Sequence, residues 1–375
     1  MKKKRGISSF NYNSIPSLLK MMIAKPHSNK YEHDFSSDKY TSDESTLKEV
    51  AEKKNMFIGT IASHNFKESN FCKVTPKYFN SVTIENALKW GHMSPNNKVG
   101  EYDFSIADEI INYGKDHNCR MRGHVLVWGR VPGKSYPLEV DEIIKNSNNP
   151  QETLKEILKE HINTVLNHFK GRVDTWDVVN EPFEVFGHKL APYSFYEILG
   201  KDYIKYAFKC AREADPNIKL YLNEQFFYYR DKRAKAFIEL LKEMVYEGVP
   251  IDGVGLQHHV MFNEQSIEDL KWFIGEIKKL GLKFEITELD IREKIFKRAK
   301  NPALAQAESY YKIVKTSVES GICKGITFWG IDDGYSWYDH IPPFNLKSYQ
   351  PNNPLIFDDK LNKKPAYYGV LNGMK

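Results

Sequence analysis

Two stretches of the sequence indicate the fold: residues 176–181 read WDVVNE, and residues 284–291 read FEITELDI. Each stretch is an apolar, β-branched run that carries a glutamate toward its carboxyl end. A run of this kind is typical of a strand that is buried on both faces, as the strands of parallel sheets are. Because such a glutamate would lie at the rim of the sheet and not in its core, Glu181 and Glu288 are candidates for an acid/base or nucleophile pair.

Short β-rich runs alternate with amphipathic stretches through most of the chain. We expect strands at residues 56–61, 79–84, 119–128, 173–180, 219–224, 253–258, 283–290 and 325–330. The clearest helical patterns cover residues 151–169, 200–214, 231–247, 266–280 and 303–320. Eight strands that alternate with helices predict an α/β protein with a closed (β/α)8 TIM barrel.

The amino-terminal residues differ in composition from the rest of the chain. Residues 1–45 are rich in Ser, Asn and Lys and lack sustained periodicity, so we predict a flexible, disordered N-terminal tail and a single catalytic barrel over residues 46–375. The apolar run at residues 15–24 is interrupted by Pro16, Ser17 and Lys20, which does not fit a secretory signal peptide. No run of 18 apolar residues occurs, so no membrane span is expected.

Composition argues against several classes of protein. The 54 basic and 49 acidic residues give a formal charge of only +5 without an arginine-rich helix, so nucleic acid is not an expected partner. The 4 cysteines show no C-x-x-C spacing and are expected to be free thiols. The adjacent His258 and His259 lack the H-E-x-x-H or H-x-H context of a metal site, so neither a metal nor another cofactor is expected.

Polar and aromatic residues gather where the predicted strands end, and in a TIM barrel that edge forms the active site. Carboxylates, amides and imidazoles can bond sugar hydroxyls, while indoles cover the apolar faces of sugar rings. Taken singly, a histidine or tryptophan here is more simply a core residue, and a strand-end glutamate could belong to an ion pair. Together they favour a site for a polyhydroxylated ligand, and the residues in question are Glu85, Asn86, Lys89, His124, Trp128, Asn180, Glu181, Asn223, Gln257, His259, Glu288, Asp290, Trp329 and Trp337.

Six blocks of sequence resemble glycoside hydrolase family 10, the endo-β-1,4-xylanases, from about Thr46 to Gly369. The resemblance implies a retaining endo-β-1,4-xylanase that cleaves internal bonds of xylan by double displacement, acting as a monomer on xylan or xylo-oligosaccharides without a cofactor. The lack of a clear signal peptide favours a cytoplasmic enzyme on sequence alone, whereas a polymeric substrate would suggest an extracellular one, so the compartment stays unassigned. The blocks are FNSVTIENALKW (79–90), RGH (122–124) through Trp128, DVVNE (177–181), GLQHH (255–259), ITELD (286–290) and TFWG (327–330).

The resemblance also implies roles for the rim residues. Glu181 would be the general acid/base and Glu288 the nucleophile. His259 and Asp290 would support the nucleophile from behind, and Asn180 would contact the sugar 2-hydroxyl. Substrate binding would fall to the remaining residues, which are Glu85, Asn86, Lys89, His124, Trp128, Asn223, Gln257, Trp329 and Trp337.

The chain departs from the family pattern in the loop after Trp128. Gly129, Arg130 and Val131 stand where the family usually has His, a small residue and Gln, and the following proline comes one residue early. The missing Gln lines the place where a glucose hydroxymethyl group would go. Mixed xylan and glucan action, or exo-type release, is therefore the alternative, whereas an inactive sugar-binding barrel or a phosphosugar enzyme fits the residues less well.

Overall fold

The computed structural model describes residues 44–226, 228–341 and 343–375. The predicted tail therefore lies outside the described residues, apart from Glu44 and Ser45. The described fold begins at the first helix, where Thr46 Oγ1 accepts from the Glu49 backbone N–H at 3.2 Å and Glu49 Oε2 accepts from the Thr46 N–H at 2.8 Å. This reciprocal cap satisfies two free donors at the start of the helix. In the described part of the chain, no helix combines the length and apolarity that crossing a bilayer requires.

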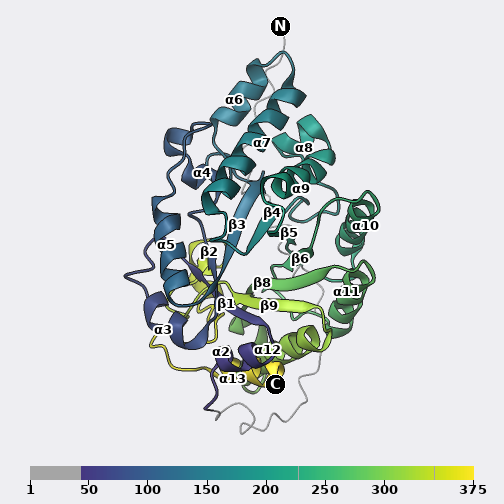
Figure 1. The fold of residues 1–375 in the computed structure, drawn as a ribbon. Coiled ribbons are helices and arrows are strands. Elements are labelled where there is room, and N and C mark those ends of the chain that lie inside the picture. Colours follow the sequence, from purple (N-terminus) through teal and green to yellow (C-terminus); the bar gives the residue numbers. More distant parts are fainter. Residues whose placement is uncertain (1–43, 227, 342) are drawn as a thin grey trace.

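The strands form a closed parallel barrel, which confirms the predicted (β/α)8 fold (Figure 1). β1 pairs with β2 on one side and with β9 on the other, and β6 pairs with β8, so every barrel strand has two neighbours. The strands are β1 (Phe57–Ala62), β2 (Ser81–Ile84), β3 (Arg120–Trp128), β4 (Thr175–Asn180), β5 (Lys219–Glu224), β6 (Gly253–Leu256), β7 (His259–Val260), β8 (Lys283–Ile291) and β9 (Cys323–Phe328).

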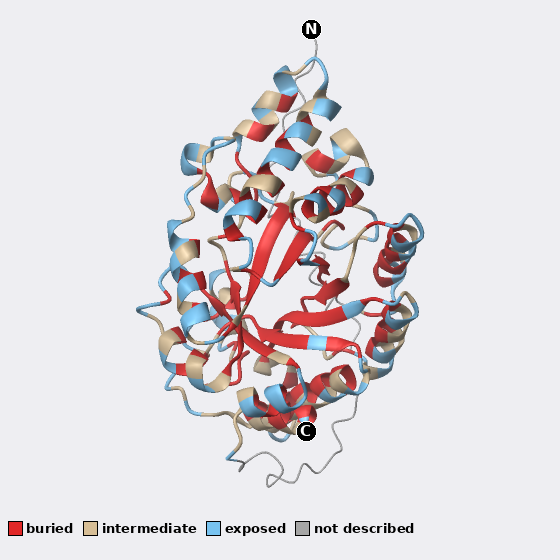
Figure 2. Ribbon diagram, viewed as in Figure 1, coloured by how far each residue is buried: buried red, intermediate tan, exposed pale blue. Residues whose placement is uncertain are grey.

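Helices follow the strands and surround the barrel. Figure 2 shows the strands almost entirely buried, with exposed residues concentrated on the helices and loops. α13 packs on α12 and α2, so the last helix adjoins the first described one. The α-helices are α2 (Leu47–Lys53), α3 (Phe71–Tyr78), α4 (Trp90–Met93), α5 (Ser105–Asp116), α6 (Glu139–Asn146), α7 (Pro150–Phe169), α8 (Ser194–Leu199), α9 (Asp202–Ala214), α10 (Lys232–Tyr246), α11 (Ile267–Lys279), α12 (Pro302–Glu319) and α13 (Pro365–Met374), and the short 3-10 turns are η3 (Pro95–Asn97), η4 (Glu293–Phe296), η5 (Trp337–His340) and η6 (Lys347–Tyr349).

The sixth barrel strand differs from the prediction. We expected one strand over residues 253–258, but β6 ends at Leu256 and the chain returns to the sheet only at β7. His258 lies in the break with a φ of 62°, in the left-handed region. β7 then pairs with the extended end of β8, matching His259 with Asp290. A continuous strand over residues 256–259 would not contain this turn. The turn places His259 beside the end of β8.

A buried ionic layer fills part of the barrel interior below the rim. Arg122 binds Asp177 through both terminal nitrogens at 2.5 Å and reaches Glu285 with Nε at 3.2 Å. Arg120 adds a second bidentate contact to Glu285 at 2.7 and 3.1 Å. Buried charges need such partners, because an unpaired one costs several kcal/mol, roughly 3–5. The layer joins β3 to β4, which Glu181 directly follows, and to β8, which carries Glu288.

Candidate active site

Glu181 lies directly after β4 and is surrounded by hydrogen-bond donors. Its φ of 50° is left-handed, and its backbone N–H donates to the carbonyl of Asn223 at 3.0 Å. Oε2 accepts from Trp128 Nε1 at 3.2 Å and from Arg130 Nη1 at 2.7 Å, while Oε1 accepts from Gln257 Nε2 at 2.9 Å. Burial alone would raise the pKa of Glu181, but Arg130 and the other donors outweigh it and lower the pKa to about 2.

Glu288 lies near the carboxyl end of β8 and is 5% exposed. Oε1 accepts from Asn223 Nδ2 at 2.8 Å, and Oε2 lies 3.2 Å from His259 Nε2. Both carboxylate oxygens therefore have fixed partners, which holds the side chain in one orientation. A carboxylate held in this way is preorganised to attack a ligand placed above it.

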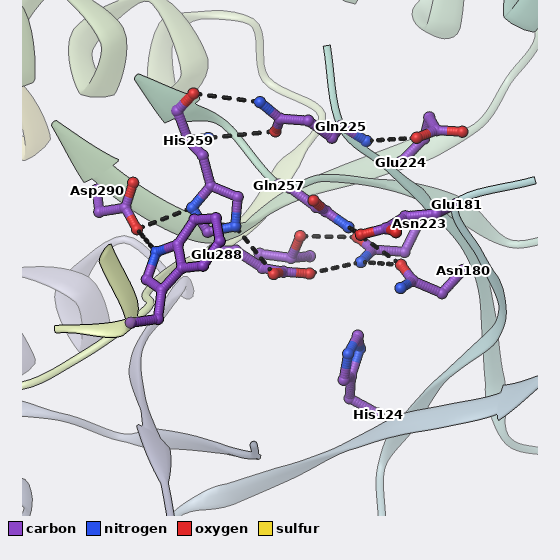
Figure 3. A network of polar contacts seen from close by, with 12 residues as sticks. His124, Asn180, Glu181, Asn223, Glu224, Gln225, Gln257, His259, Glu288 and Asp290 are labelled. Atoms are coloured by element: carbon purple, nitrogen blue, oxygen red, sulfur yellow. Dashed lines mark hydrogen bonds and ion pairs between the residues drawn. The ribbon is translucent and has the colours of Figure 1, made fainter. Parts of the chain in front are cut away.

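His259 bridges Glu288 and Asp290 (Figure 3). Its Nδ1 lies 2.8 Å from Asp290 Oδ2. Asp290 also accepts from Trp337 Nε1 and from the Tyr338 hydroxyl, both at 2.7 Å. Burial opposes the charged imidazole, but Asp290 and Glu288 prevail and raise the pKa of His259 to about 10. A protonated His259 donates from both ring nitrogens, one to each carboxylate.

Three side-chain amides connect the two glutamates in one hydrogen-bonded chain (Figure 3). Gln257 Nε2 donates both to Glu181 Oε1 and, at 3.2 Å, to Asn180 Oδ1. Asn223 Nδ2 donates both to Asn180 Oδ1 at 2.9 Å and to Glu288 Oε1. Asn180 Oδ1 thus accepts from both neighbours, and no hydrogen bond from its Nδ2 occurs among the described residues, so this group can donate to a ligand hydroxyl.

The other residues predicted for substrate binding lie on the same rim. Lys89 Nζ donates to Asn86 Oδ1 at 2.8 Å and lies 4.9 Å from the centre of the Trp128 ring. Burial lowers the pKa of Lys89, while the negative charges of Glu288, Glu85 and Glu181 oppose this shift. Glu85 itself accepts from the Ser63 hydroxyl.

His124, on β3, contacts Asp177 through Nδ1 at 2.9 Å, and its ring meets that of Trp329 edge to face with 5.4 Å between centroids. Trp337 covers His259, with 4.6 Å between their rings. Asn223 is 0% exposed and Gln257 is 2% exposed, and both form hydrogen bonds with other side chains of the network. Their contacts fit residues that orient the two glutamates better than residues that bind sugar directly.

Several residues of the site were not among the predictions. Arg130, which the sequence marked only as a departure from the family pattern, reaches into the site and binds Glu181. Glu224, which is fully buried, forms an ion pair of 2.6 Å with Arg233 from α10. Tyr338 supports Asp290 from η5. The strand-end position of Glu224 was a usable signal, but its partner lies in the following helix and no local pattern links the two.

The arrangement offers two fixed carboxylates, a cationic imidazole and a set of amide donors. Among the described residues, no group of three or more histidine, cysteine, aspartate or glutamate side chains is placed to hold a metal ion. One carboxylate can attack a carbon centre while the other exchanges a proton with the departing or entering oxygen. This combination of groups is suited to acid-assisted substitution at the carbon of an acetal.

The chain belongs to glycosyl hydrolase family 10, whose family model matches residues 46–373. It is 34% identical over 337 residues to a beta-1,4-xylanase of Dictyoglomus thermophilum, covering 87% of this chain and 90% of that protein. It is also 34% identical over 312 residues to endo-1,4-beta-xylanase A of Thermoanaerobacterium saccharolyticum, with 81% of this chain covered. There the match spans about a quarter of the relative, 25% of its length.

A solved structure supports the same relationship. The chain resembles xylanase 10B of Thermotoga petrophila RKU-1, which was crystallised with xylobiose, at a TM-score of 0.78 and 31% sequence identity. The similarity covers 89% of this chain and 98% of that one.

Proposed function

We propose that the protein is a retaining endo-β-1,4-xylanase. The observation that carries this proposal is the chain of amide hydrogen bonds between Glu181 and Glu288. It holds the two carboxylates at the same rim of the barrel, although their surroundings differ. Family membership and xylanase relatives support the substrate class.

In the first half of the reaction, Glu288 attacks the anomeric carbon and Glu181 gives its proton to the leaving oxygen, so that a covalent glycosyl-enzyme forms and the shortened glycan departs. In the second half, Glu181 takes a proton from water, the resulting nucleophile displaces Glu288, and the sugar is released with its original anomeric configuration. The same Glu181 is thus an acid first and a base second.

The surrounding residues supply binding and charge balance. Asn180 Nδ2 would donate to the sugar 2-hydroxyl, a contact that strengthens as positive charge develops on the ring. The charge of His259, shared between Glu288 and Asp290, lowers the negative charge that the leaving carboxylate must carry in the second half. Glu85, Asn86, Lys89, His124, Trp128, Trp329 and Trp337 would bind the glycone.

Product analysis tests this proposal. We expect xylan to give a ladder of xylo-oligosaccharides early in the digestion, and proton NMR to detect β-anomers before mutarotation. Release of xylose alone from chain ends would replace the endo assignment by an exo one. First-formed α-anomers would contradict the retaining mechanism, and faster cleavage of soluble cellulose than of xylan would favour the mixed glucan alternative.

A further inference from the structure

Arg130 contacts the candidate acid/base from a braced loop between β3 and α6. The loop is held by hydrogen bonds from the Val131 N–H to Ser135 Oγ at 3.0 Å and from the Gly133 N–H to the Tyr136 carbonyl at 2.8 Å. Gly129 has no room for a side chain, because a Cβ there would lie 2.9 Å from Cβ of Tyr193. The backbone beneath Arg130 is therefore anchored on both sides.

The contact itself is short and partly shielded from water. Arg130 Nη1 lies 2.7 Å from Glu181 Oε2, and the two side chains are 33% and 13% exposed. Charge-assisted bonds of this length are among the stronger ones, and shielding reduces their screening. Among the described residues, Arg130 is the only cationic side chain that hydrogen-bonds Glu181.

All three side chains that bond Glu181 are donors, and together they occupy both of its oxygens. This arrangement suits an ionised carboxylate, because a proton on Oε2 would face a guanidinium N–H. The second half of the proposed reaction needs this ionised form. The first half needs the proton in place.

We propose that Arg130 is a positioning residue that holds Glu181 in its base form and must withdraw from the carboxylate before the first half of the reaction. The inference rests on the proposed function of Glu181. Because the Arg130 side chain is 33% exposed, its guanidinium can move toward solvent when a sugar ring occupies the space beside Glu181.

Other charged and titratable groups also face Glu181, and none replaces Arg130. Lys89, after β2, favours the ionised form from a greater distance. Glu224, at the end of β5, opposes it, since burial and Glu181 raise the pKa of Glu224 to about 7 against the effect of Arg233. Tyr193, before α8, has its pKa raised by burial, so it stays neutral. Glu288, on β8, is the other carboxylate of the proposed catalytic pair.

The direction of the pH effect follows from these charges. The charge of Arg130 is the largest single effect that opposes burial at Glu181, so its removal raises the pKa of Glu181. The alkaline limb of kcat/KM reports the acid of the free enzyme, and it should move to higher pH when Arg130 is removed.

The experiment compares Arg130→Gln and Arg130→Lys with the unaltered protein on two substrates. With xylotetraose, whose leaving group needs a proton, the alkaline limb of Arg130→Gln should shift upward by at least about one pH unit. With 2,4-dinitrophenyl xylobioside, which departs unassisted, it should not shift. Arg130→Lys keeps a charge and should shift less. Lys134→Gln, an exposed change on the same loop, is the matched control and should not shift.

A second readout does not depend on turnover. In 13C-carboxyl NMR with labelled glutamate, the Glu181 resonance, assigned from its loss in Glu181→Gln, should titrate at least about one pH unit higher in Arg130→Gln. An unshifted titration and limb would overturn the proposal, as would complete loss of xylotetraose hydrolysis in a folded Arg130→Gln protein. If the unaltered protein leaves xylotetraose intact while the Glu181 titration shifts, the proposed function fails and the Arg130 contact stands.

Discussion

Asn223 donates a hydrogen bond from Nδ2 to Glu288 Oε1 at 2.8 Å, and its side chain has no exposure to solvent. The bond fixes the rotation of the proposed nucleophile, and the same nitrogen holds Asn180. A hydrogen bond to a charged group contributes about 1.5–3 kcal/mol, so Asn223→Ala should lower kcat/KM on xylo-oligosaccharides by about 10- to 100-fold. Steady-state kinetics will measure the change.

The matched control for this substitution is Asn217→Ala, which alters an exposed asparagine just before the same strand. Its kcat/KM should equal that of the unaltered protein. A folded Asn223→Ala protein with unchanged kcat/KM would mean that His259 alone orients Glu288.

The two glutamates should respond differently to removal. Glu288→Ala should lose turnover on every substrate, because no covalent intermediate can form, and added azide should restore cleavage of an activated aryl glycoside. Glu181→Ala should still cleave an aryl xylobioside with a good leaving group while losing xylan hydrolysis. Rates on both substrates, with exposed Glu268→Ala as control, will separate the roles. Equal losses on both substrates in Glu181→Ala would remove it as the acid.

The charge on His259 should make the stability of the protein depend on pH. Asp290 and Glu288 raise its pKa to about 10 in the folded state, above its usual value. The folded protein thus holds this proton more tightly than the unfolded chain, so the added stability is full below about pH 6.5 and disappears as pH rises to about 10. The free energy of unfolding in urea should fall over this window, and less steeply in His259→Gln.

Exposed His340→Gln serves as the comparison for the pH series. It should keep the slope of the unaltered protein. A His259→Gln protein with that same slope would show that His259 is neutral when folded.

Discrimination between xylose and glucose chains should be weaker than in a family member with the full loop after the third strand. Steric exclusion of a hydroxymethyl group is worth about 1–3 kcal/mol. Trp337 is in place beside His259, but Arg130 is bound to Glu181 and the loop lacks its amide. The ratio of kcat/KM for aryl xylobioside over aryl cellobioside measures this. A ratio equal to that relative's would assign the exclusion to another residue.

The sequence predicted the barrel well because its strands are local signals. An apolar run with a polar end, such as residues 175–180, specifies both the strand and the residue at its rim. The same logic placed Glu181, Glu288, His259 and Asp290 on one rim, and the structure brings them together. The break after Leu256 was missed because no local pattern marks the positive φ of His258, whose Nδ1 lies 2.5 Å from the hydroxyl of Tyr229, 29 residues earlier in the chain.

Long-range contacts of flexible side chains were out of reach of sequence patterns. Arg130 has four side-chain torsions, and only the folded loop shows that its guanidinium meets Glu181 instead of solvent. The pair of Glu224 and Arg233 likewise joins a strand end to the next helix. Such contacts are set by how elements pack, whereas periodicity reports only which face of an element is buried.

The ionic layer under the rim has an evolutionary consequence. Asp177 lies on β4, just before Glu181, and Glu285 lies on β8, three residues before Glu288. Arg122 binds both Asp177 and Glu285. Replacement of one of these residues leaves a buried charge without its partner, at a cost of about 3–5 kcal/mol. We therefore expect the three residues to be replaced only together. Related sequences should therefore inherit Arg122, Asp177 and Glu285 as a linked set. The rim loops can then change in sequence and accept other glycans, while these three residues preserve the spacing of β4 and β8, on which the chemistry depends.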